Sequence, residues 1–232
     1  MLKIHFHLHT SSDPEDAILH NEFELIDRAS EQQCDVLSFT LHNKFLFSEE
    51  LESYAAQKGI LLIPGIEKTI ENKHVLIINA TQETEKIETF EQLREYRHHH
   101  PECFTIAAHP FYPTNYCLGE KLLQHLELFD AVEYSWYFSK STQLFNQKAE
   151  NFAKKYHKPL VTTADNHLLQ FLNFSYLLVD AEKTPQAIFK AIKAGKLKRF
   201  NTPLSTWKLF TIFMTMEWMQ IKTKFRKNQQ RK

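Results

Sequence analysis

Short apolar runs alternate with longer amphipathic stretches along most of this chain, and this alternation limits its possible folds more than any other feature. Eight runs are predicted to be strands, at 3–7, 35–40, 60–63, 74–79, 104–107, 131–134, 160–163 and 176–179. Helices are predicted between most of them, at 22–32, 48–57, 90–100, 120–128, 141–156 and 185–194. Nearly continuous apolar strands are typical of parallel sheets covered on both faces. Seven or eight such β/α units favour one α/β barrel over two domains.

Composition excludes several classes of protein. Hydrophobic residues make up 43% of the chain, including 19 Phe, so a sizeable core is expected. The formal net charge is zero, so no overall charge attracts nucleic acid or membranes. Only four glycines occur, and neither a G-x-G-x-x-G motif nor a P-loop is present. Three scattered cysteines and the lack of a signal-peptide pattern at the start predict a cytoplasmic protein.

Histidines and acids gather at the same end of successive predicted strands. The chain contains 13 histidines, and His7 and His9 close the first strand as an H-x-H pair. The residues placed in a similar way after later segments are Asp13, His42, Glu67, His109, Glu133, Asp165 and His167, while His74 begins the fourth strand. Because the C-terminal ends of barrel strands converge on one face, these distant residues are expected to share one pocket.

The residue types in this pocket are those of a metal site. An H-x-H pair on extended backbone points both rings to one side, which suits two ligands of one metal. The Glu67 carboxylate can bridge two cations, and imidazole with carboxylate is the ligand mix of zinc, manganese and iron sites. Each residue alone has another interpretation: His42 or His74 can be structural, and Asp13 or Asp165 can cap a turn or helix. Their coincidence at one end favours the metal site.

The motifs at these positions resemble those of the PHP (polymerase and histidinol phosphatase) family of metal-dependent phosphoesterases. The resemblance runs from His5 to about Lys198. It rests on His7-Leu8-His9-Thr10, Thr40-Leu41-His42, Gly65-Ile66-Glu67, His74, Ala108-His109-Pro110 and Asp165-Asn166-His167. It implies a distorted seven-stranded, TIM-like β/α barrel as the catalytic domain, here 1–200, ahead of a C-terminal extension at 201–232.

The resemblance further implies two or three divalent metal ions (zinc, manganese or iron) and hydrolysis by a metal-activated hydroxide. Carried over by motif, the first metal takes His7, His9, Glu67 and Asp165; the second takes Glu67, His74 and His109; the third takes Asp13, His42 and His167. Glu67, Asp165 and His109 are the expected catalytic residues.

Two positions depart from the family pattern. His5 and Leu41 stand where members usually carry Asp, two residues before the H-x-H pair and directly before the second-motif histidine. Both are expected beside the ligands, where side chains orient ligands and tune metal affinity. These two replacements are therefore expected to alter the activity or to weaken the binding of one metal, although the ligand set itself is complete.

The expected substrate is a small phosphorylated metabolite or nucleotide. An exonuclease acting on oligonucleotide ends and a non-catalytic metal-binding partner module are the alternatives. The neutral net charge favours small substrates, whereas the basic C-terminus favours nucleic acid. Lys44, Lys68 and Tyr112 follow ligand motifs and are candidate phosphate contacts, or else ordinary surface side chains.

The C-terminal extension differs from the rest of the chain. A helix predicted at 205–223 is rich in Trp and Met, but it is too short and too polar for a membrane span. We expect it to pack on the barrel bottom or against a second chain, which makes a homodimer possible. A basic amphipathic helix can also lie on an anionic membrane, although the sequence gives no firm membrane partner. Residues 222–232 hold six basic residues and no acid, and are expected to form a solvated, disordered end or to steer a nucleic-acid substrate.

Overall fold

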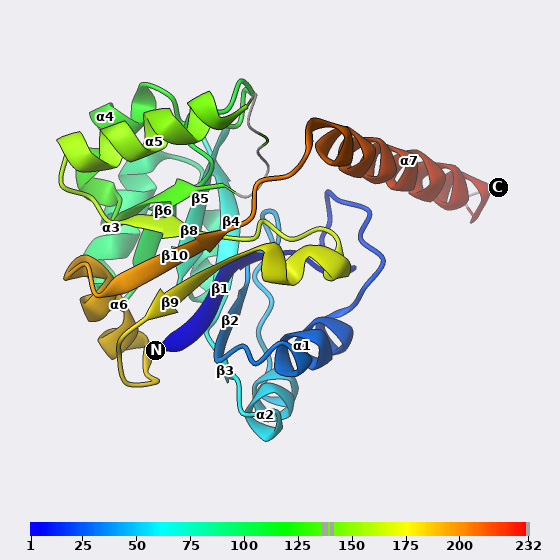
Figure 1. The fold of residues 1–232 in the computed structure, drawn as a ribbon, viewed down its shortest axis with the longest axis horizontal. Coiled ribbons are helices and arrows are strands. Elements are labelled where there is room, and N and C mark those ends of the chain that lie inside the picture. Colours follow the sequence, from blue (N-terminus) through cyan, green and yellow to red (C-terminus); the bar gives the residue numbers. More distant parts are fainter. Residues whose placement is uncertain (136–138, 140–141, 231–232) are drawn as a thin grey trace.

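The computed structural model describes residues 1–135, 139 and 142–230, which form two five-stranded sheets flanked by helices (Figure 1). The first sheet has the order β10 (Leu197–Asn201), β9 (Ser175–Val179), β1 (Leu2–Leu8), β2 (Val36–Phe39) and β3 (Leu61–Leu62). The second has the order β4 (Gly65–Ile70), β5 (Lys73–Ile78), β6 (Phe104–Ala107), β7 (Ala131–Tyr134) and β8 (Leu160–Thr162).

Strand pairing is only partly parallel. The pairs β1–β2, β2–β3, β6–β7 and β7–β8 are parallel, whereas β9 runs antiparallel to β1 and β10, and β5 runs antiparallel to β4 and β6. Isolated bridges join Leu8 to Asn166 and His42 to Glu67 across the two sheets. The mixed α/β architecture is confirmed. The expected seven-stranded barrel is wrong, because the described strands number five in each sheet and their ladders do not close into one barrel.

Two strands were absent from the sequence expectation. In β4, Glu67 and Lys68 interrupt the apolar pattern, although both are buried. A two-residue turn, Glu71-Asn72, joins β4 to β5, and its φ angles of 47° and 63° are those of a hairpin turn that matches sheet twist. The other strand, β10, is mostly exposed and polar, so it lacks the apolar run that identifies a buried strand.

Most helices lie close to their expected positions, but the last one continues to Gln230, so the expectation of a disordered segment directly after residue 223 is wrong. The helices are α1 (Glu22–Glu31), α2 (Glu49–Gln57), α3 (Phe90–His99), α4 (Lys121–Gln124), α5 (Gln143–Lys155), α6 (Pro185–Lys193) and α7 (Thr206–Gln230). Short 3-10 segments are η1 (Gln82–Lys86), η2 (Leu126–Leu128) and η3 (Leu169–Phe174). Capping boxes at Asn21 and Thr89 fix the starts of α1 and α3. The helix expected at 120–128 is instead α4 followed by η2, and Ser141, the expected start of α5, lies outside the described residues.

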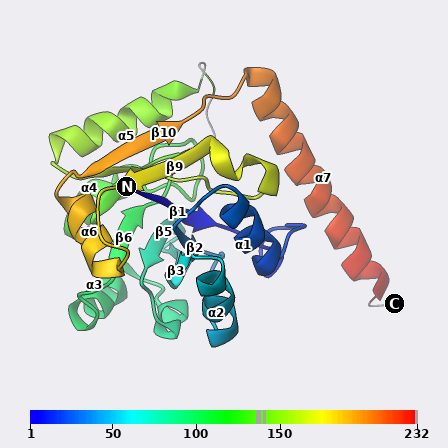
Figure 2. The same cartoon turned by 60° about the horizontal axis from the view of Figure 1, so that its bottom comes forward.

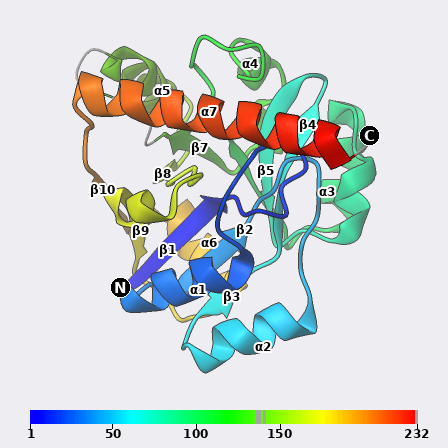
Figure 3. The same cartoon turned by 90° about the vertical axis from the view of Figure 1, so that its right-hand side faces the viewer.

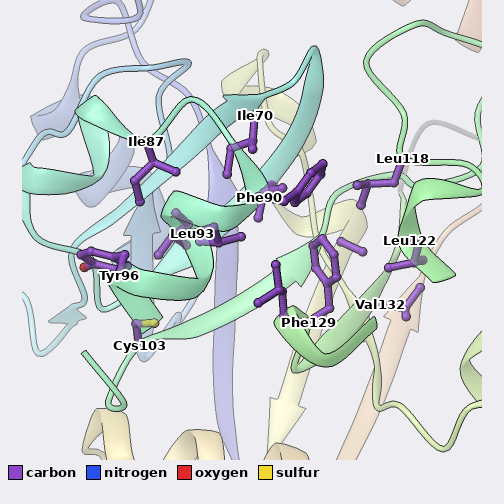
Figure 4. Close-up of a cluster of buried hydrophobic side chains, with 14 of the residues drawn as sticks. Ile70, Ile87, Phe90, Leu93, Tyr96, Cys103, Leu118, Leu122, Phe129 and Val132 are labelled. Atoms are coloured by element: carbon purple, nitrogen blue, oxygen red, sulfur yellow. The ribbon is translucent and has the colours of Figure 1, made fainter. Parts of the chain in front are cut away.

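Three apolar clusters hold the helices on the sheets. One packs α3, α4 and α5 against the second sheet around Phe90 and Phe129, both almost completely buried (Figure 4). Another joins both sheets to α6, where Phe104 stacks on Phe189 at 4.9 Å between ring centroids. A third lies between the first sheet and α1 and α2. Burying a Phe contributes roughly 1.5–3 kcal/mol, so these clusters fix the strand ends that carry the polar residues described below.

The last helix, α7, lies apart from the others, across the end of the fold toward which β1 points (Figures 2 and 3). Leu204, Leu209 and Ile212 pack with Phe171 of η3 and anchor the beginning of α7. The expectation that this helix packs on the opposite end, the barrel bottom, is therefore wrong.

Candidate metal centre

The H-x-H pair lies on β1 with both rings turned to the same side. The centroids of the His7 and His9 rings are 5.1 Å apart, and both side chains are fully buried. The β1–β2 register shifts between His5 and Leu8, which marks a bulge where the pair begins. The period-two argument from the sequence therefore places these two side chains correctly.

Glu67 lies at the centre of the cluster, on β4, with 1% of its side chain exposed. Its two carboxylate oxygens face five imidazoles. The distances from Oε2 are 3.0 Å to His7 Nε2, 3.1 Å to His42 Nε2 and 3.3 Å to His9 Nε2, and those from Oε1 are 2.9 Å to His74 Nδ1 and 3.2 Å to His109 Nε2. A Cβ on Gly65, two residues earlier, would come within 2.2 Å of Ser38 Oγ. The glycine therefore lets β4 approach β2 closely, and this approach places the Glu67 carboxylate within the cluster of histidines.

Asp165 approaches the same cluster from the other edge, after β8. Its Oδ1 lies 3.3 Å from His7 Nε2 and 3.5 Å from His9 Nε2. Asp165 has φ 40° and His109 has φ 28°, a left-handed conformation that non-glycine residues seldom adopt. Backbone strain of this kind gathers at functional sites, where the surrounding structure enforces it.

The loop after β1 adds Asp13, whose two oxygens have different partners. Oδ2 lies 3.0 Å from His9 Nδ1 and 3.1 Å from His42 Nδ1. Oδ1 accepts hydrogen bonds from the backbone N–H groups of Glu15 and Asp16. Asp13 thus caps a turn and also lies within the cluster, while its role as a metal ligand stays a prediction.

His167 lies beside the group expected for the third metal but has another acid as its partner. Its ring stacks on His9 with 4.4 Å between centroids, and its Nε2 lies 2.8 Å from Asp16 Oδ2. Asp13 and His42 group with His9 instead. Sequence reasoning missed Asp16, because a third acid in an exposed-looking Asp-Pro-Glu-Asp run carries no motif signal.

A second missed role belongs to Glu133 at the end of β7. Its Oε1 lies 2.8 Å from His7 Nδ1 and accepts the Thr163 hydroxyl, while its Oε2 accepts the backbone N–H of His109. The sequence showed Glu133 at a strand end among the candidate ligands but gave it no role. Through these bonds it orients two histidines while lying completely buried behind them.

Charges in the cluster are tightly coupled. Burial alone would lower the pKa of His7, but the carboxylates of Asp165, Glu67 and Glu133 raise it to about 10. Burial would raise the pKa of Glu67, yet the surrounding imidazoles hold it well below its usual range. The buried carboxylates of this cluster are thus surrounded by imidazoles. They need positive charge beside them, either from protons on the imidazoles or from metal ions.

A cavity of about 220 Å³ opens onto these residues. Its lining residues are Asp16, His42, Glu67, His74, His109, Tyr112, Thr114, Tyr116, Cys117, Ser135, Asp165, His167, Phe213 and Met216. Phe213 and Met216 belong to α7, so this helix forms part of the wall. In the same region Gln220 Nε2 donates to Asp16 Oδ1 at 2.6 Å.

The three candidate phosphate contacts differ in position. Tyr112 lines the cavity, and burial raises the pKa of its hydroxyl. Lys44 Nζ donates to the Ser12 carbonyl and Lys68 Nζ donates to the Glu85 carbonyl, both at 2.9 Å, and neither residue is part of the cavity lining. Tyr112 is therefore the best placed of the three to touch a substrate.

The two residues that depart from the family pattern are both completely buried. Burial lowers the pKa of His5 to about 3, so its ring is neutral, and the Tyr176 ring meets it edge-on at 6.2 Å between centroids. Neither ring nitrogen of His5 has a hydrogen-bond partner among the described residues. His5 therefore does not supply the acceptor that an Asp would bring to this position.

Comparison with known proteins supports the sequence resemblance. A family model described as PHP-associated matches residues 143–197. No curated protein matches the chain. One similar structure is a two-domain protein from Bacteroides vulgatus containing a predicted PHP-like metal-dependent phosphoesterase, at 19% identity and a TM-score of 0.68 over 86% of this chain and 64% of that one.

Two further structures share the fold. PsfC from Pseudomonas syringae is 14% identical with a TM-score of 0.63, over 94% of this chain and 98% of that one. The lesion-specific endonuclease EndoQ from Pyrococcus furiosus is 16% identical with a TM-score of 0.60, over 85% of this chain and 57% of that one. Endonuclease Q is also known in complex with a 27-mer duplex that has an abasic lesion at the active site. The PHP-associated match and the fold shared with these proteins confirm the resemblance of this chain to the PHP family.

Proposed function

We propose that this protein is a metal-dependent hydrolase of phosphate esters, acting on a small phosphorylated metabolite or nucleotide. The observation that carries the proposal is Glu67, a buried carboxylate within 3.3 Å of five imidazole nitrogens at the floor of a cavity. Carboxylate and imidazole together suit zinc, manganese or iron. The similar proteins named as metal-dependent phosphoesterase and endonuclease support the same reaction class.

The residues present fit divalent metal ions. Ligand atoms lie within 4.8 Å of one another in four overlapping groups: His7, His9 and Asp165; His7, Glu67 and His109; His9, Asp13 and His42; and His42, Glu67 and His74. His74 Nδ1 lies 2.9 Å from Glu67 Oε1, yet the two atoms make no hydrogen bond. Two ligands of one cation would lie in this way, close together but not bonded to each other. The overlap of the groups supports two or three ions with Glu67 shared between them. His167 as a ligand of the third ion stays a prediction.

Bound divalent ions would supply an activated water at neutral pH and offset charge on phosphoryl oxygens. The chain's own residues would do the rest. Glu133 holds the His7 ring through Nδ1, which leaves Nε2 facing Glu67 and Asp165. Glu67, Asp165 and His109 are proposed as the catalytic residues because all three line the cavity, Glu67 and Asp165 from buried positions and His109 from a partly buried one.

Cavity size supports a small substrate. A volume of about 220 Å³ lies below the roughly 300–1,000 Å³ of typical ligand pockets, and α7 side chains bound it. Tyr112 is the proposed substrate contact, and Lys44 and Lys68 would have to leave their carbonyl partners to reach a phosphate. An exonuclease acting on oligonucleotide ends is the second candidate, favoured by the fold shared with an endonuclease.

The test is a panel of phosphomonoesters, phosphodiesters and short oligonucleotides, assayed with metal-loaded protein before and after chelation. We expect turnover of a small ester that chelator abolishes and manganese or zinc restores, with Glu67→Gln as the inactive control. Turnover of oligonucleotides that falls steeply with salt would favour the nuclease, because contacts to a phosphate backbone release counterions. Full metal content with no turnover of any ester would instead indicate a non-catalytic metal-binding module.

A further inference from the structure

Two sides of α7 carry apolar residues, and they have different surroundings. On the inner side Leu209, Ile212 and Met219 are at most 7% exposed, against the body of the protein. The outer side carries five large apolar residues more than half exposed: Trp207 at 74%, Phe210 at 53%, Met214 at 53%, Trp218 at 57% and Ile221 at 52%. The inner side thus accounts for the attachment of α7, whereas the outer residues lie mostly exposed on the described part of the chain.

The outer residues form one continuous stripe. They follow one another at intervals of three, four, four and three residues, which keeps them on a single face of a helix with 3.6 residues per turn. Exposed apolar side chains scattered singly are ordinary, but a contiguous stripe marks an interaction surface. The view in Figure 3 shows α7 at the front of the molecule, where a large partner can reach it.

Basic charge follows the stripe. Lys222 lies at its end, with Nζ 4.6 Å from the Trp218 ring centroid. From there to the C-terminus the sequence carries Lys222, Lys224, Arg226, Lys227, Arg231 and Lys232 and no acid. Among the described residues no helix is long and apolar enough to cross a membrane. Tryptophan and apolar residues beside clustered Lys and Arg are characteristic of helices that lie in the plane of an anionic lipid surface.

We propose that the outer face of α7 (Trp207, Phe210, Met214, Trp218 and Ile221), with the basic segment that follows, docks the protein on an anionic lipid surface. Pairing with a second copy in parallel would bring two basic segments together, which the charges disfavour, and pairing in either direction is an outcome of the test below. Docking through the outer face leaves the inner face in place on the metal cavity. The inference does not depend on the reaction proposed above.

The test is co-sedimentation of the full-length protein with vesicles of phosphatidylcholine alone or mixed with phosphatidylserine. We expect binding to the mixed vesicles only, and about tenfold or greater weakening for Trp207→Ser/Trp218→Ser. The matched control is Leu123→Ser/Leu144→Ser, which changes leucines 50% and 45% exposed on α4 and α5 and should bind like the unchanged chain. Thermal melts establish that both variants are folded.

Three results would overturn the proposal. One is the absence of binding to mixed vesicles, or equal binding to neutral ones. Another is unchanged binding by the Trp variant, which would leave the basic segment as the whole cause. The third is a full-length dimer in light scattering that the Trp substitutions dissociate, since a second copy would then occupy this face.

Discussion

The candidate metal centre and α7 are unusual in opposite ways. The centre places acids and imidazoles in the buried interior, whereas α7 places tryptophan and other apolar side chains at exposed positions. Ordinary proteins bury apolar groups and leave charged ones in water. Buried acids are unfavourable unless cations bind beside them. Exposed apolar side chains on α7 are unfavourable unless a partner covers them, and the partner proposed above is an anionic lipid surface. The comparison teaches that binding sites of different kinds can be found by the same test, which is a side chain in the wrong environment.

Removing the shared carboxylate should have the largest effect. Glu67→Ala takes away a group that faces five histidines, so both metals that share it should be lost. Turnover should fall by more than the roughly 10- to 100-fold typical of losing an orienting residue. Metal content by elemental analysis and hydrolysis rate are the measurements. His42→Ala serves as the comparison and should empty fewer sites; metal content that survives Glu67→Ala would disprove the bridging role.

Loss of an orienting residue should have a smaller effect at the same centre. Glu133→Gln keeps the volume but weakens the bonds to the His7 ring and the His109 backbone. Metal affinity should fall roughly 10- to 100-fold, as measured by competition with a coloured chelator. Glu150→Gln is the matched control, since this acid lies on α5, 3.6 Å from Arg199. Equal metal affinity in the two variants would mean that Glu133 serves only to stabilise the fold.

Truncation separates the two faces of α7. A chain ending at residue 203 loses Leu209, Ile212 and Met219, and burial of each such side chain contributes roughly 1.5–3 kcal/mol. We expect a lower urea midpoint and aggregation. A chain ending at residue 223 keeps those contacts, so its stability and its turnover of small substrates should hardly change. If the shorter chain stays soluble, monomeric and equally stable, the inner face does not contribute to packing.

Local patterns predicted most of the elements because each depends on its own residues. The expected strands at 104–107 and 131–134 match β6 and β7, since an unbroken apolar run reports burial directly. The pattern failed at β4, because Glu67 and Lys68 are polar residues inside a strand. It failed again for closure of the barrel, because antiparallel pairing of β5 and β9 depends on which strands meet.

For the site, the sequence supplied the nine candidate ligands but not all of their partners. His7, His9, Glu67, His109 and Asp165 could be chosen because they stand in motifs at or just after predicted strands. Glu133 and Asp16 received no role, because hydrogen bonds to His7 and His167 form only when distant segments meet. A carboxylate that orients a histidine can lie far from it in the sequence, so a local sequence pattern does not reveal the contact.

The sequence by itself determined which side chains are candidate cation ligands, that most of them stand near the ends of predicted strands, and that a basic segment follows a Trp-rich helix. Only the tertiary structure decided that α7 lies over the cavity of the candidate metal centre, with Phe213 and Met216 in its wall and Trp207 and Trp218 exposed. The reason is physical. An α-helix with apolar residues on two sides has no preferred orientation of its own, so the surface it packs against decides which side is buried.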